Sequence, residues 1–333
     1  MCGPRLGLAG AALVVVTAAA CGDNATAPDA VDAARRDYPP WTMIVVPDTQ
    51  GYTYEYPDLW RAQTRWIADH ARELDVRLIV HVGDVTEWNT PGEWQTARRG
   101  LDDLDGVAPL VLVPGNHDYD VTRPRASRLT EIWPVDALAA QPTFGGLFEP
   151  DRTDNSYQRL EIAGDPWLVL GLEWGPRDAV LDWAAGVLDA HPDHHVVLVT
   201  HAYLYKDDRR YDWARYGRGQ LYNPHAYVGT AWPEVNDGEE IWQRLIAGRD
   251  HVDVVVCGHV PDEGVGRLTS EAAGGHPVHQ LLANFQSGPM GGNGYLRIVT
   301  FRADRIEVRT YSPYLDVYLG EPEHAFSLPW SPP

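Results

Sequence analysis

The sequence predicts an α/β fold, and three observations support this. From residue 41 onward, apolar runs rich in Val, Ile and Leu alternate with amphipathic stretches. The apolar runs are continuous rather than alternating, which is typical of strands buried on both faces of a sheet. The chain has 333 residues, 44% of them hydrophobic, which is enough for one large domain or two small ones. We assign residues 41–333 to one globular domain with alternating strands and helices.

The elements follow in chain order. The expected buried strands are TMIVVP (42–47), RLIVHVG (77–83), PLVLVPG (109–115), HVVLVTH (195–201) and VDVVVCGH (252–259). Amphipathic stretches predict helices over residues 58–73, 93–104, 178–190 and 238–247. Two later runs, YLRIVTF (295–301) and RIEVRTY (305–311), alternate more regularly, which favours antiparallel strands near the C-terminus.

The first 40 residues are expected to lie outside this domain. Residues 1–20 have the pattern of an export signal, with Arg5 before an apolar core that is too short to span a membrane. Cys21 follows small residues and resembles the lipid-modified cysteine of bacterial lipoproteins; the alternative is an ordinary secretory signal with a chance cysteine. Residues 21–40 have the composition of a flexible tether. The sequence therefore predicts an exported protein, anchored by a lipid on Cys21 to the periplasmic or extracellular face of the cell envelope.

The charge distribution excludes two classes of partner. The formal net charge is −20, Lys206 is the only lysine, and the arginines are scattered. Binding of nucleic acid through a basic surface is not expected, because it needs clustered Lys and Arg. An acidic protein is also unsuited to an anionic membrane surface, so the lipid on Cys21 is the only membrane contact that we predict.

Polar side chains follow each of the five buried runs. In chain order they are Asp48 and Gln50, Asp84, the stretch Asn116-His117-Asp118, His201 and His259. Each alone has a structural explanation, as a turn former or as a satisfied histidine. Sites in α/β sheets form at the carboxyl ends of strands, however, and carboxylate, amide and imidazole together suit divalent metals. Five such strand ends therefore predict a metal site at one edge.

This order of motifs resembles the calcineurin-like metallophosphoesterases, the family that includes purple acid phosphatases. The family pattern is D-x-H, GD, GNH[DE], H and GH-x-H, and this sequence has DTQ, GDVTEWN, GNHD, VTHAY and GHVP. PDTQ, together with GNHD, VTHAYL and TYSP, is similar to a bacterial exported branch with Gln in the first motif. The resemblance extends over residues 45–311. It implies a four-layer α-β-β-α sandwich with two mixed β-sheets, and a phosphoesterase catalytic domain over residues 41–333.

The resemblance also implies two divalent metal ions. Asp84 would bridge them, and Asn116, His201 and His259 would complete the second site. That ligand set suits Fe, Mn or Zn.

The first metal site departs from the family pattern. The resemblance implies that Asp48 and the residue at position 50 hold this metal. Gln50 and Pro261 stand where the family has histidines, so the ligands that remain are oxygens, which suit Mn, Mg or Ca. Asn284 or Gln286 would either add an oxygen ligand or order the loop that carries them.

His117 and Asp118 are the catalytic residues that the resemblance implies. His117 would lie beside the phosphate and the leaving group, with Asp118 orienting it. The implied reaction is hydrolysis of a phosphate ester by a metal-activated water. The sequence has no HExxH, G-x-S-x-G or GxxxxGK[ST] motif, which argues against a zinc peptidase, a serine hydrolase and a nucleotide-driven kinase.

The expected substrate is a small-molecule or glycan phosphate ester. Tyr and Trp residues flank the motifs; they would line a cleft for a sugar, base or aryl group, or else fill loops and core. The segment 209–227 would recognise an anionic or glycan substrate, or form a surface lid. Two alternatives remain open: a catalytically weakened metal-binding protein that binds a phosphorylated or glycan ligand, and a hydrolase of another ester.

Two other features are expected to be structural. The run HPDHH (191–195) precedes a strand at its amino end, opposite the predicted site, and is expected to be a solvated turn. Cys257 lies within an apolar strand and is expected to be an inert core thiol. Because Cys2 would leave with the signal and Cys21 would carry lipid, we expect no disulfide within the chain.

Overall fold

The chain is described by a computed structural model that covers residues 1, 3, 38–261 and 264–332. Apart from residues 1 and 3, the predicted signal lies outside the described residues, as do Cys21 and most of the 21–40 tether. In the part of the chain that is described, no helix is long and apolar enough to cross a membrane. Tyr38 already packs against Trp330, with ring centroids 5.6 Å apart, so the packed domain includes the last residues before the first strand.

The first of two large β-sheets is mixed. Its strands are β1 (Trp41–Val46), β2 (Val76–His81), β3 (Leu110–Leu112), β13 (Leu296–Phe301), β14 (Arg305–Ser312), β15 (Val317–Leu319) and β16 (Ala325–Pro329). The order is β15-β14-β13-β1-β2-β3, with β16 also pairing with β14. β1, β2 and β3 are parallel, and β13 pairs antiparallel with β1. The carboxyl ends of β1, β2 and β3 therefore lie at one edge.

The second sheet is mixed as well. Its strands are β4 (Phe144–Leu147), β5 (Ser156–Ile162), β6 (Asp165–Gly171), β7 (His195–Val199), β10 (Val252–Cys257), β11 (Val265–Glu271) and β12 (Pro277–Ala283). The order is β11-β12-β10-β7-β6-β5-β4, and the four central strands run parallel. A separate hairpin pairs β8 (Leu204–Tyr205) with β9 (Arg209–Arg210).

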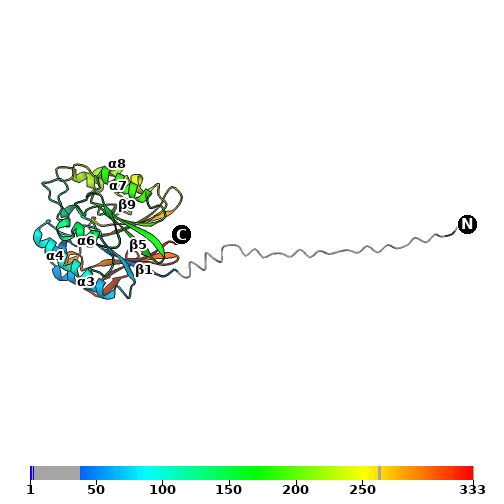
Figure 1. Ribbon diagram of the computed structural model, residues 1–333, viewed down its shortest axis with the longest axis horizontal. Helices are drawn as coiled ribbons and strands as arrows, with labels where there is room; N and C mark the ends of the chain where they lie inside the picture. Colours follow the sequence, from blue (N-terminus) through cyan, green and yellow to red (C-terminus); the bar gives the residue numbers. More distant parts are fainter. Residues whose placement is uncertain (2, 4–37, 262–263, 333) are drawn as a thin grey trace.

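Helices cover the outer faces of the two sheets, with α3 and α4 on one side of the molecule and α7 on the other (Figure 1). The α-helices are α2 (Gln50–Tyr54), α3 (Pro57–His70), α4 (Pro91–Leu101), α5 (Leu129–Ile132), α6 (Val135–Ala139), α7 (Asp178–Asp189), α8 (Trp213–Tyr216), α9 (Gly238–Ile241) and α10 (Pro289–Gly292). Short 3₁₀ turns cover Asp102–Leu104, Asn116–Asp118, Gly217–Gly219 and Pro224–Tyr227, and a π-helix covers Trp242–Ile246. The observed layers confirm the predicted four-layer α-β-β-α fold.

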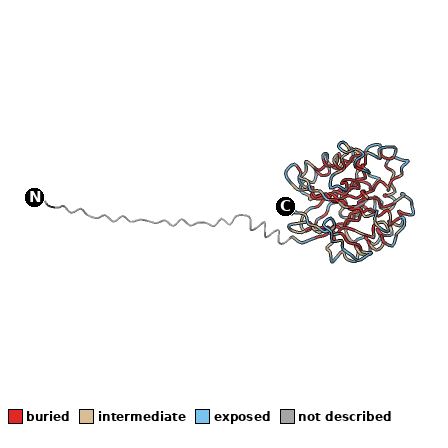
Figure 2. The backbone as a smooth tube through the Cα atoms, turned by 180° about the vertical axis from the view of Figure 1, so that it is seen from behind, coloured by how far each residue is buried: buried red, intermediate tan, exposed pale blue. Residues whose placement is uncertain are grey.

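The interior between the sheets is apolar and aromatic. Trp41 of β1 stacks on Phe301 of β13 with centroids 4.1 Å apart, and its edge meets Trp167 of β6 in the other sheet at 4.8 Å. Valines and leucines of both sheets fill the rest of this layer. Two further cores lie under the helices, one below α3 and α4 and one below α7. Most residues of the central strands are accordingly buried (Figure 2), because both faces of each sheet are covered.

The predicted elements are confirmed within a few residues, but several strands were not predicted. The four expected helices correspond to α3, α4 with its 3₁₀ extension, α7, and α9 with the π-helix that follows it. β13 and β14 are antiparallel, as the sequence predicted. No strands were predicted for β4, β5, β6, β11 and β12, which make up most of the second sheet. In β5 and β11, charged and small residues alternate with apolar ones, so neither contains a continuous apolar run.

Candidate metal centre

The five predicted strand ends converge, but they belong to two sheets rather than one. β1, β2 and β3 of the first sheet lead to Asp48, Asp84 and Asn116. β7 and β10 of the second sheet lead to His201 and His259. The prediction of a single sheet edge was therefore wrong. The site lies where the carboxyl ends of two stacked sheets meet, and this places residues from distant parts of the chain opposite each other.

Positive backbone φ angles and adjacent glycines allow the candidate ligand side chains to approach one another closely. Asp84 and His259 adopt positive φ angles of 49° and 76°, a left-handed conformation that non-glycine residues seldom adopt. Gly83 has a φ of 101°, and a Cβ there would lie 2.7 Å from Nδ1 of His201. A Cβ on Gly258 would collide with the carboxylate of Asp48. The glycines of the GD and GH motifs are therefore required by the close approach of ligand side chains.

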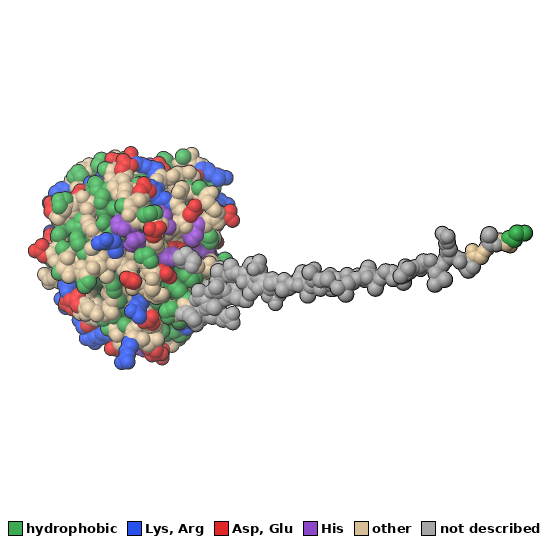
Figure 3. Space-filling model, turned by 45° about the vertical axis from the view of Figure 1, so that its right-hand side comes forward, with side chains coloured by type: hydrophobic (Ala, Val, Ile, Leu, Met, Phe, Trp, Pro, Cys, Tyr) green, Lys and Arg blue, Asp and Glu red, His purple; other side chains and the backbone are tan. Residues whose placement is uncertain are grey.

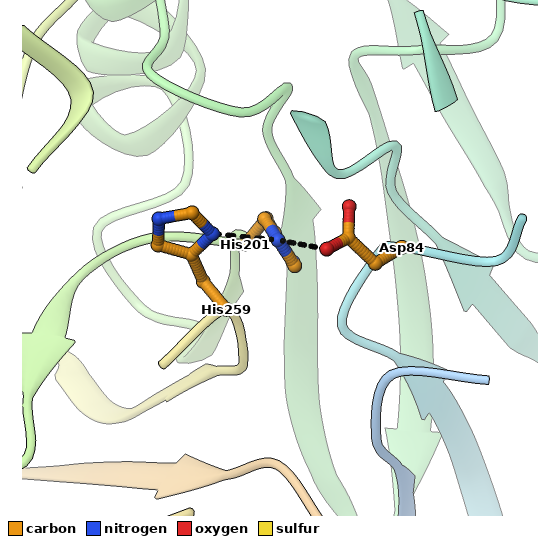
Figure 4. Close-up of side chains that lie close together, drawn as sticks. All are labelled: Asp84, His201 and His259. Atoms are coloured by element: carbon orange, nitrogen blue, oxygen red, sulfur yellow. Dashed lines mark hydrogen bonds and ion pairs between the residues drawn. The ribbon is translucent and has the colours of Figure 1, made fainter. Parts of the chain in front are cut away.

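Three buried side chains form the centre of the site (Figure 4). Asp84, His201 and His259 each offer one ligand atom, and these atoms all lie within 4.8 Å of one another. Nε2 of His201 is 3.1 Å from Oδ2 of Asp84 and 3.2 Å from Nδ1 of His259. All three residues are at most 4% exposed. This is the geometry of a closed, buried cation site rather than a surface cluster of charges.

The other nitrogen of each histidine determines which atom faces the centre. Nδ1 of His201 lies 2.8 Å from the carbonyl of Val82, and Nε2 of His259 lies 2.7 Å from the carbonyl of Tyr222. A carbonyl can only accept, so both of these nitrogens carry protons and donate. In the neutral rings, Nε2 of His201 and Nδ1 of His259 therefore present lone pairs to each other and to Asp84. Such convergence is unfavourable without a cation, and a carbonyl behind each imidazole is typical of metal-ligating histidines.

Two amide oxygens beside the cluster lack hydrogen-bond partners. Oδ1 of Asn116 and Oε1 of Gln50 are buried, and neither has a partner among the described residues. A buried oxygen without a partner costs free energy, and a bound cation would remove that cost. The imidazole, amide and carboxylate groups around Asp84, and the oxygens of Asp48 and Gln50, are donors that suit a divalent cation.

Asp48 lies beside the three-residue cluster and is held by two donors. Its Oδ2 accepts from the backbone N–H of His259 at 3.1 Å and from Nδ2 of Asn284 at 2.9 Å. Oδ1 of Asn284 in turn accepts from the backbone N–H of Gln286 at 2.9 Å. Of the two alternatives left open for Asn284, these contacts favour the ordering of its loop and of Asp48.

Burial and mutual charge shift the pKa values of the cluster in opposite directions. Burial raises the pKa of Asp48 to about 8, and the charge of Asp84 adds to this effect. Burial also opposes ionisation of Asp84, but the charges of His201 and His117 outweigh it and hold the Asp84 pKa below its usual range. Burial lowers the pKa of His201, but Asp84 and Asp48 raise it overall to about 9. Burial and the charge of His201 lower the pKa of His259 to about 3. The pocket thus favours one positive charge next to Asp84.

His117 is oriented toward the cleft beside the metal centre. Its backbone N–H donates to Oδ1 of Asp84 at 2.9 Å, and its Nδ1 lies 3.0 Å from the carbonyl of Glu87. Nδ1 therefore carries a proton and donates, which leaves Nε2 free for a ligand. Burial lowers the pKa of His117, but the charge of Asp84 and the bond to the Glu87 carbonyl raise it overall.

Asp118 does not orient His117 in the way that the sequence predicted. Its carboxylate accepts from the backbone N–H groups of Gly115, Val85 and Thr86, and from the hydroxyl of Thr86. These bonds use both oxygens, so Asp118 joins the loop after β2 to the loop after β3. The correction has a physical reason, because adjacent residues in a 3₁₀ turn point their side chains in different directions. Asp118 is therefore a positioning residue for two loops.

Two residues that the sequence analysis missed hold the site together. Oε2 of Glu87 accepts from Nε2 of Gln50 at 2.6 Å. His81, which is fully buried, lies with its Nε2 2.9 Å from Oγ1 of Thr49, next to Asp48. Glu87 had a signal in the sequence, as a carboxylate three residues after Asp84 in GDVTEWN. His81 had no such signal, because it lies inside an apolar strand.

A cleft of about 530 Å³ opens next to the metal centre. Asn116 and His117 form part of its wall, and Trp88, which is 63% exposed, and Tyr227 also line it. Its charges balance, since Glu87, Asp120, Arg123 and Arg128 all lie in the lining. The cleft is much larger than a phosphate group, so it has room for the rest of an ester.

The segment 209–227 contributes to the site rather than lying apart from it. Its Tyr222 supplies the carbonyl behind His259, and its Tyr227 lines the cleft. The rings of Tyr211, Tyr222 and Tyr227 lie 6.0, 6.4 and 6.2 Å from the imidazole of His259. The segment therefore places three tyrosine rings around one candidate metal ligand.

A second group of possible ligands, His225, Asp237 and Glu240, is accounted for by local structure. Asp237 caps α9 by accepting from the backbone N–H of Glu240 at 3.2 Å. Glu240 accepts from the backbone N–H of Asp237 at 2.9 Å and lies 2.7 Å from Nε2 of His225. These bonds form a capping box that a histidine extends, so the group needs no metal.

Comparison with known proteins identifies relatives of this chain. Residues 42–263 match the family model described as calcineurin-like phosphoesterase. The uncharacterized protein YvnB of Bacillus subtilis (strain 168) is 29% identical over 311 residues, which cover 88% of this chain. The chain spans only 22% of the length of that relative.

One of the solved structures that align with this chain reaches a TM-score of 0.50 and shares the fold. The purple acid phosphatase PPD1 from yellow lupin (Lupinus luteus) seeds aligns with a TM-score of 0.50 and 11% identity, over 88% of this chain and 54% of that one. GAP50, the anchor in the inner membrane complex of Plasmodium, aligns with a TM-score of 0.42 and 10% identity, over 88% of this chain and 89% of that one.

Proposed function

Because the chain belongs to the calcineurin-like phosphoesterase family, we propose that it is a metal-dependent hydrolase of phosphate esters. One observation carries the proposal. One ligand atom from each of Asp84, His201 and His259 lies within 4.8 Å of the other two, and the nearby oxygens of Asn116 and Gln50 have no partner among the described residues. A protein without a metal would have little reason to bury so many acceptors together.

The residues divide into two ligand sets. His201, His259 and Asn116 would hold one divalent ion (Fe, Mn or Zn) with Asp84, and Gln50 would join Asp48 and Asp84 around the other (Mn, Mg or Ca). Two such ions would supply an activated water and Lewis-acid stabilisation of the phosphate.

The chain itself supplies binding and proton transfer. With Nδ1 of His117 donating to the Glu87 carbonyl, Nε2 faces the ligand. In the imidazolium form, which the raised pKa of His117 favours, Nε2 is positioned to donate to the phosphate or to the leaving oxygen. A positioned general acid of this kind typically contributes about 10²–10⁴-fold to a rate. Burial of the cluster strengthens these interactions, since water competes less for them.

The proposed substrate is a small-molecule or glycan phosphate ester. The cleft next to His117 would hold the leaving group, with Trp88 and Tyr227 offering flat apolar faces to a sugar or an aromatic ring. The balanced charges of the cleft favour a leaving group without a strong net charge. The overall charge of −20 argues against a nucleic-acid polymer as partner.

The decisive experiment compares Asp84→Asn with the unchanged protein. Metal-stripped protein is assayed with phenyl phosphate and bis-phenyl phosphate after addition of Mn²⁺, Mg²⁺, Ca²⁺, Fe²⁺ or Zn²⁺. We expect turnover with at least one metal, and a loss of about 10³-fold or more in Asp84→Asn, because this carboxylate serves both metals. Turnover that survives in Asp84→Asn would refute the mechanism. If folded, metal-loaded protein turns over neither ester, the alternative of a metal-binding protein is favoured instead.

We further propose that the protein is exported and lipid-anchored through Cys21. The support is the order of Arg5, an apolar core and small residues directly before Cys21. In cell fractionation, the unchanged protein should sediment with membranes and Cys21→Ser should not. The same distribution for both proteins would contradict lipid anchoring.

A further inference from the structure

The amide of Gln50 is oriented by one contact. Nε2 of Gln50 donates to Oε2 of Glu87 at 2.6 Å. Only the amide nitrogen can make this contact, because a carboxylate accepts and does not donate. The contact therefore fixes the rotation of the amide and turns Oε1 the other way, where it is buried without a partner among the described residues.

The orientation matters because an amide has two different ends. A free glutamine amide can present its N–H₂ group or its oxygen, and only the oxygen can bind a cation. A metal-ligating histidine meets a similar requirement when its second nitrogen donates to a carboxylate or carbonyl. The carboxylate of Glu87 accepts a hydrogen bond from Gln50, as the carbonyl of Tyr222 accepts one from His259. In each of the two ligand sets, therefore, an acceptor fixes the orientation of a candidate ligand.

Glu87 is itself held firmly and contacts a second catalytic element. Its backbone N–H donates to Oε1 of Glu93 at 3.0 Å, at the start of α4. Its carbonyl accepts from Nδ1 of His117, and its Oε1 lies 3.8 Å from that same nitrogen. Glu87 therefore links the first metal site to His117.

We propose that Glu87 is a positioning residue that makes Gln50 an oxygen ligand, so that the pair Gln50–Glu87 does the work of the histidine that the family has at this position. The inference rests on the proposed function, because it assumes that the first site binds a metal. Gln50 would then still bind the metal through its oxygen, although it stands where the family has a histidine. It also predicts that a carboxylate or another acceptor is needed at position 87 for tight binding at the first site.

The test is a calorimetric titration of metal-stripped protein with Mn²⁺. The unchanged protein should bind two ions, and Gln50→Ala identifies which binding step belongs to the first site. We expect Glu87→Ala to weaken that step by about tenfold or more, the usual cost of losing a residue that supports a ligand, and to leave the other step unchanged. Glu87→Gln keeps an acceptor for the Gln50 amide, so it should weaken the first step less than Glu87→Ala.

A double variant separates positioning from direct effects. If Glu87 acts through Gln50, then Gln50→Ala and the double variant Gln50→Ala/Glu87→Ala should bind Mn²⁺ equally at the first site. Asp120→Ala, which removes another carboxylate from the same cleft, controls for general attraction of cations and should leave both steps unchanged.

Three results would overturn the inference. The first is that Glu87→Ala lowers the Mn²⁺ affinity of the first site equally with and without Gln50. Glu87 would then be a ligand itself or would attract the cation only through its charge. The second is no loss on Glu87→Ala. The third is binding of a single ion by the unchanged protein. Because the titration needs no substrate, a failure of this inference can be distinguished from a failure of the proposed function in the ester assay.

Discussion

Strands β7 and β10 each carry His or Asp at both ends, and the two ends differ in how their polar atoms are paired. At the carboxyl ends, His201 and His259 meet Asp84, and lone pairs exceed donors. At the amino ends, His195 and Asp253 meet beside Trp330, and both oxygens of the Asp253 carboxylate have partners. The residue types are similar, so composition alone does not distinguish the two clusters.

In the amino-end cluster, the carboxylate of Asp253 is satisfied as it stands. Oδ2 of Asp253 lies 2.8 Å from Nδ1 of His195, and Oδ1 accepts from Nε1 of Trp330 at 2.9 Å. Nε2 of His276 lies 3.4 Å from the same Oδ1. Both oxygens of the carboxylate are therefore occupied. A cation would have to displace an existing partner, whereas at the carboxyl ends it would supply a missing one.

This cluster also corrects the expectation for the HPDHH run. His195 is not in a solvated turn: its side chain is only 11% exposed and stacks on Trp167 at 4.6 Å. The neighbouring histidines are nearer the surface, where His191 and His194 contact each other with ring centroids 5.0 Å apart. Figure 3 shows histidine side chains gathered on one face of the molecule. The prediction that the run is not a metal site stays untested.

The comparison teaches that acceptors converging from several residues, rather than the presence of Asp and His, indicate a cation site. A structural cluster pairs its charges and stabilises the fold. A functional cluster keeps buried groups that only a ligand can satisfy. This distinction makes the two clusters respond differently to substitution.

The largest expected difference comes from removing the histidine at each end of β7. His201→Ala should lose tight binding at the second metal site, and its turnover should fall by about 10³-fold, because a ligand and a buried partner of Asp84 are both lost. Metal content measured by mass spectrometry and kcat for phenyl phosphate provide the readout.

His195→Ala is the matched control for that variant. It should keep its metal and its turnover, and it should lose about 1–3 kcal/mol of unfolding free energy, because Asp253 loses a buried partner. Chemical denaturation measures this loss. If His195→Ala reduced turnover as much as His201→Ala, the assignment of the amino-end cluster to structure would be wrong.

A smaller effect is expected from acid. The bonds from His195 and His276 outweigh burial and lower the pKa of Asp253 to about 2, from an ordinary value near 3.8. Because the folded pKa lies below the unfolded one, the stability that Asp253 contributes is present above about pH 4 and is lost as the pH falls toward 2. The shift corresponds to about 2 kcal/mol. Denaturation curves between pH 2 and 6 measure it.

Asp253→Asn separates this contribution from the other carboxylates. The variant should be less stable near neutral pH, and it should lose less further stability between pH 4 and 2 than the unchanged protein. An identical pH dependence for both proteins would show that Asp253 does not titrate in this window.

Much of the fold was predictable because buried parallel strands have a strong local pattern. β1, β2, β7 and β10 are nearly continuous runs of Val, Ile and Leu, and each ends in a turn of Gly, Asp or His. The second sheet was less predictable, since its outer strand β5 alternates buried and exposed residues. Pairing between sheets was not predictable from single runs, because it depends on contacts between distant segments.

In the candidate site, too, some features were predictable from local sequence and others depended on contacts between distant segments. The sequence indicated Asp84, His201 and His259 because strand ends limit where such residues can lie. The support from the Tyr222 carbonyl and from Glu87 was not predictable, since it depends on how loops fold over the sheet edge. The role of Asp118 was predicted wrongly for the same reason: adjacency in sequence does not determine which neighbour a side chain faces.

The carbonyl of Tyr222 has a consequence for how this protein can be diversified. Loops beside a catalytic centre are often treated as exchangeable parts that change specificity and leave the chemistry intact. Here the segment 209–227 supplies the acceptor behind His259, so its main chain belongs to the centre as much as the strands do. A graft that replaces this loop would have to reproduce that one carbonyl, whatever side chains it brings.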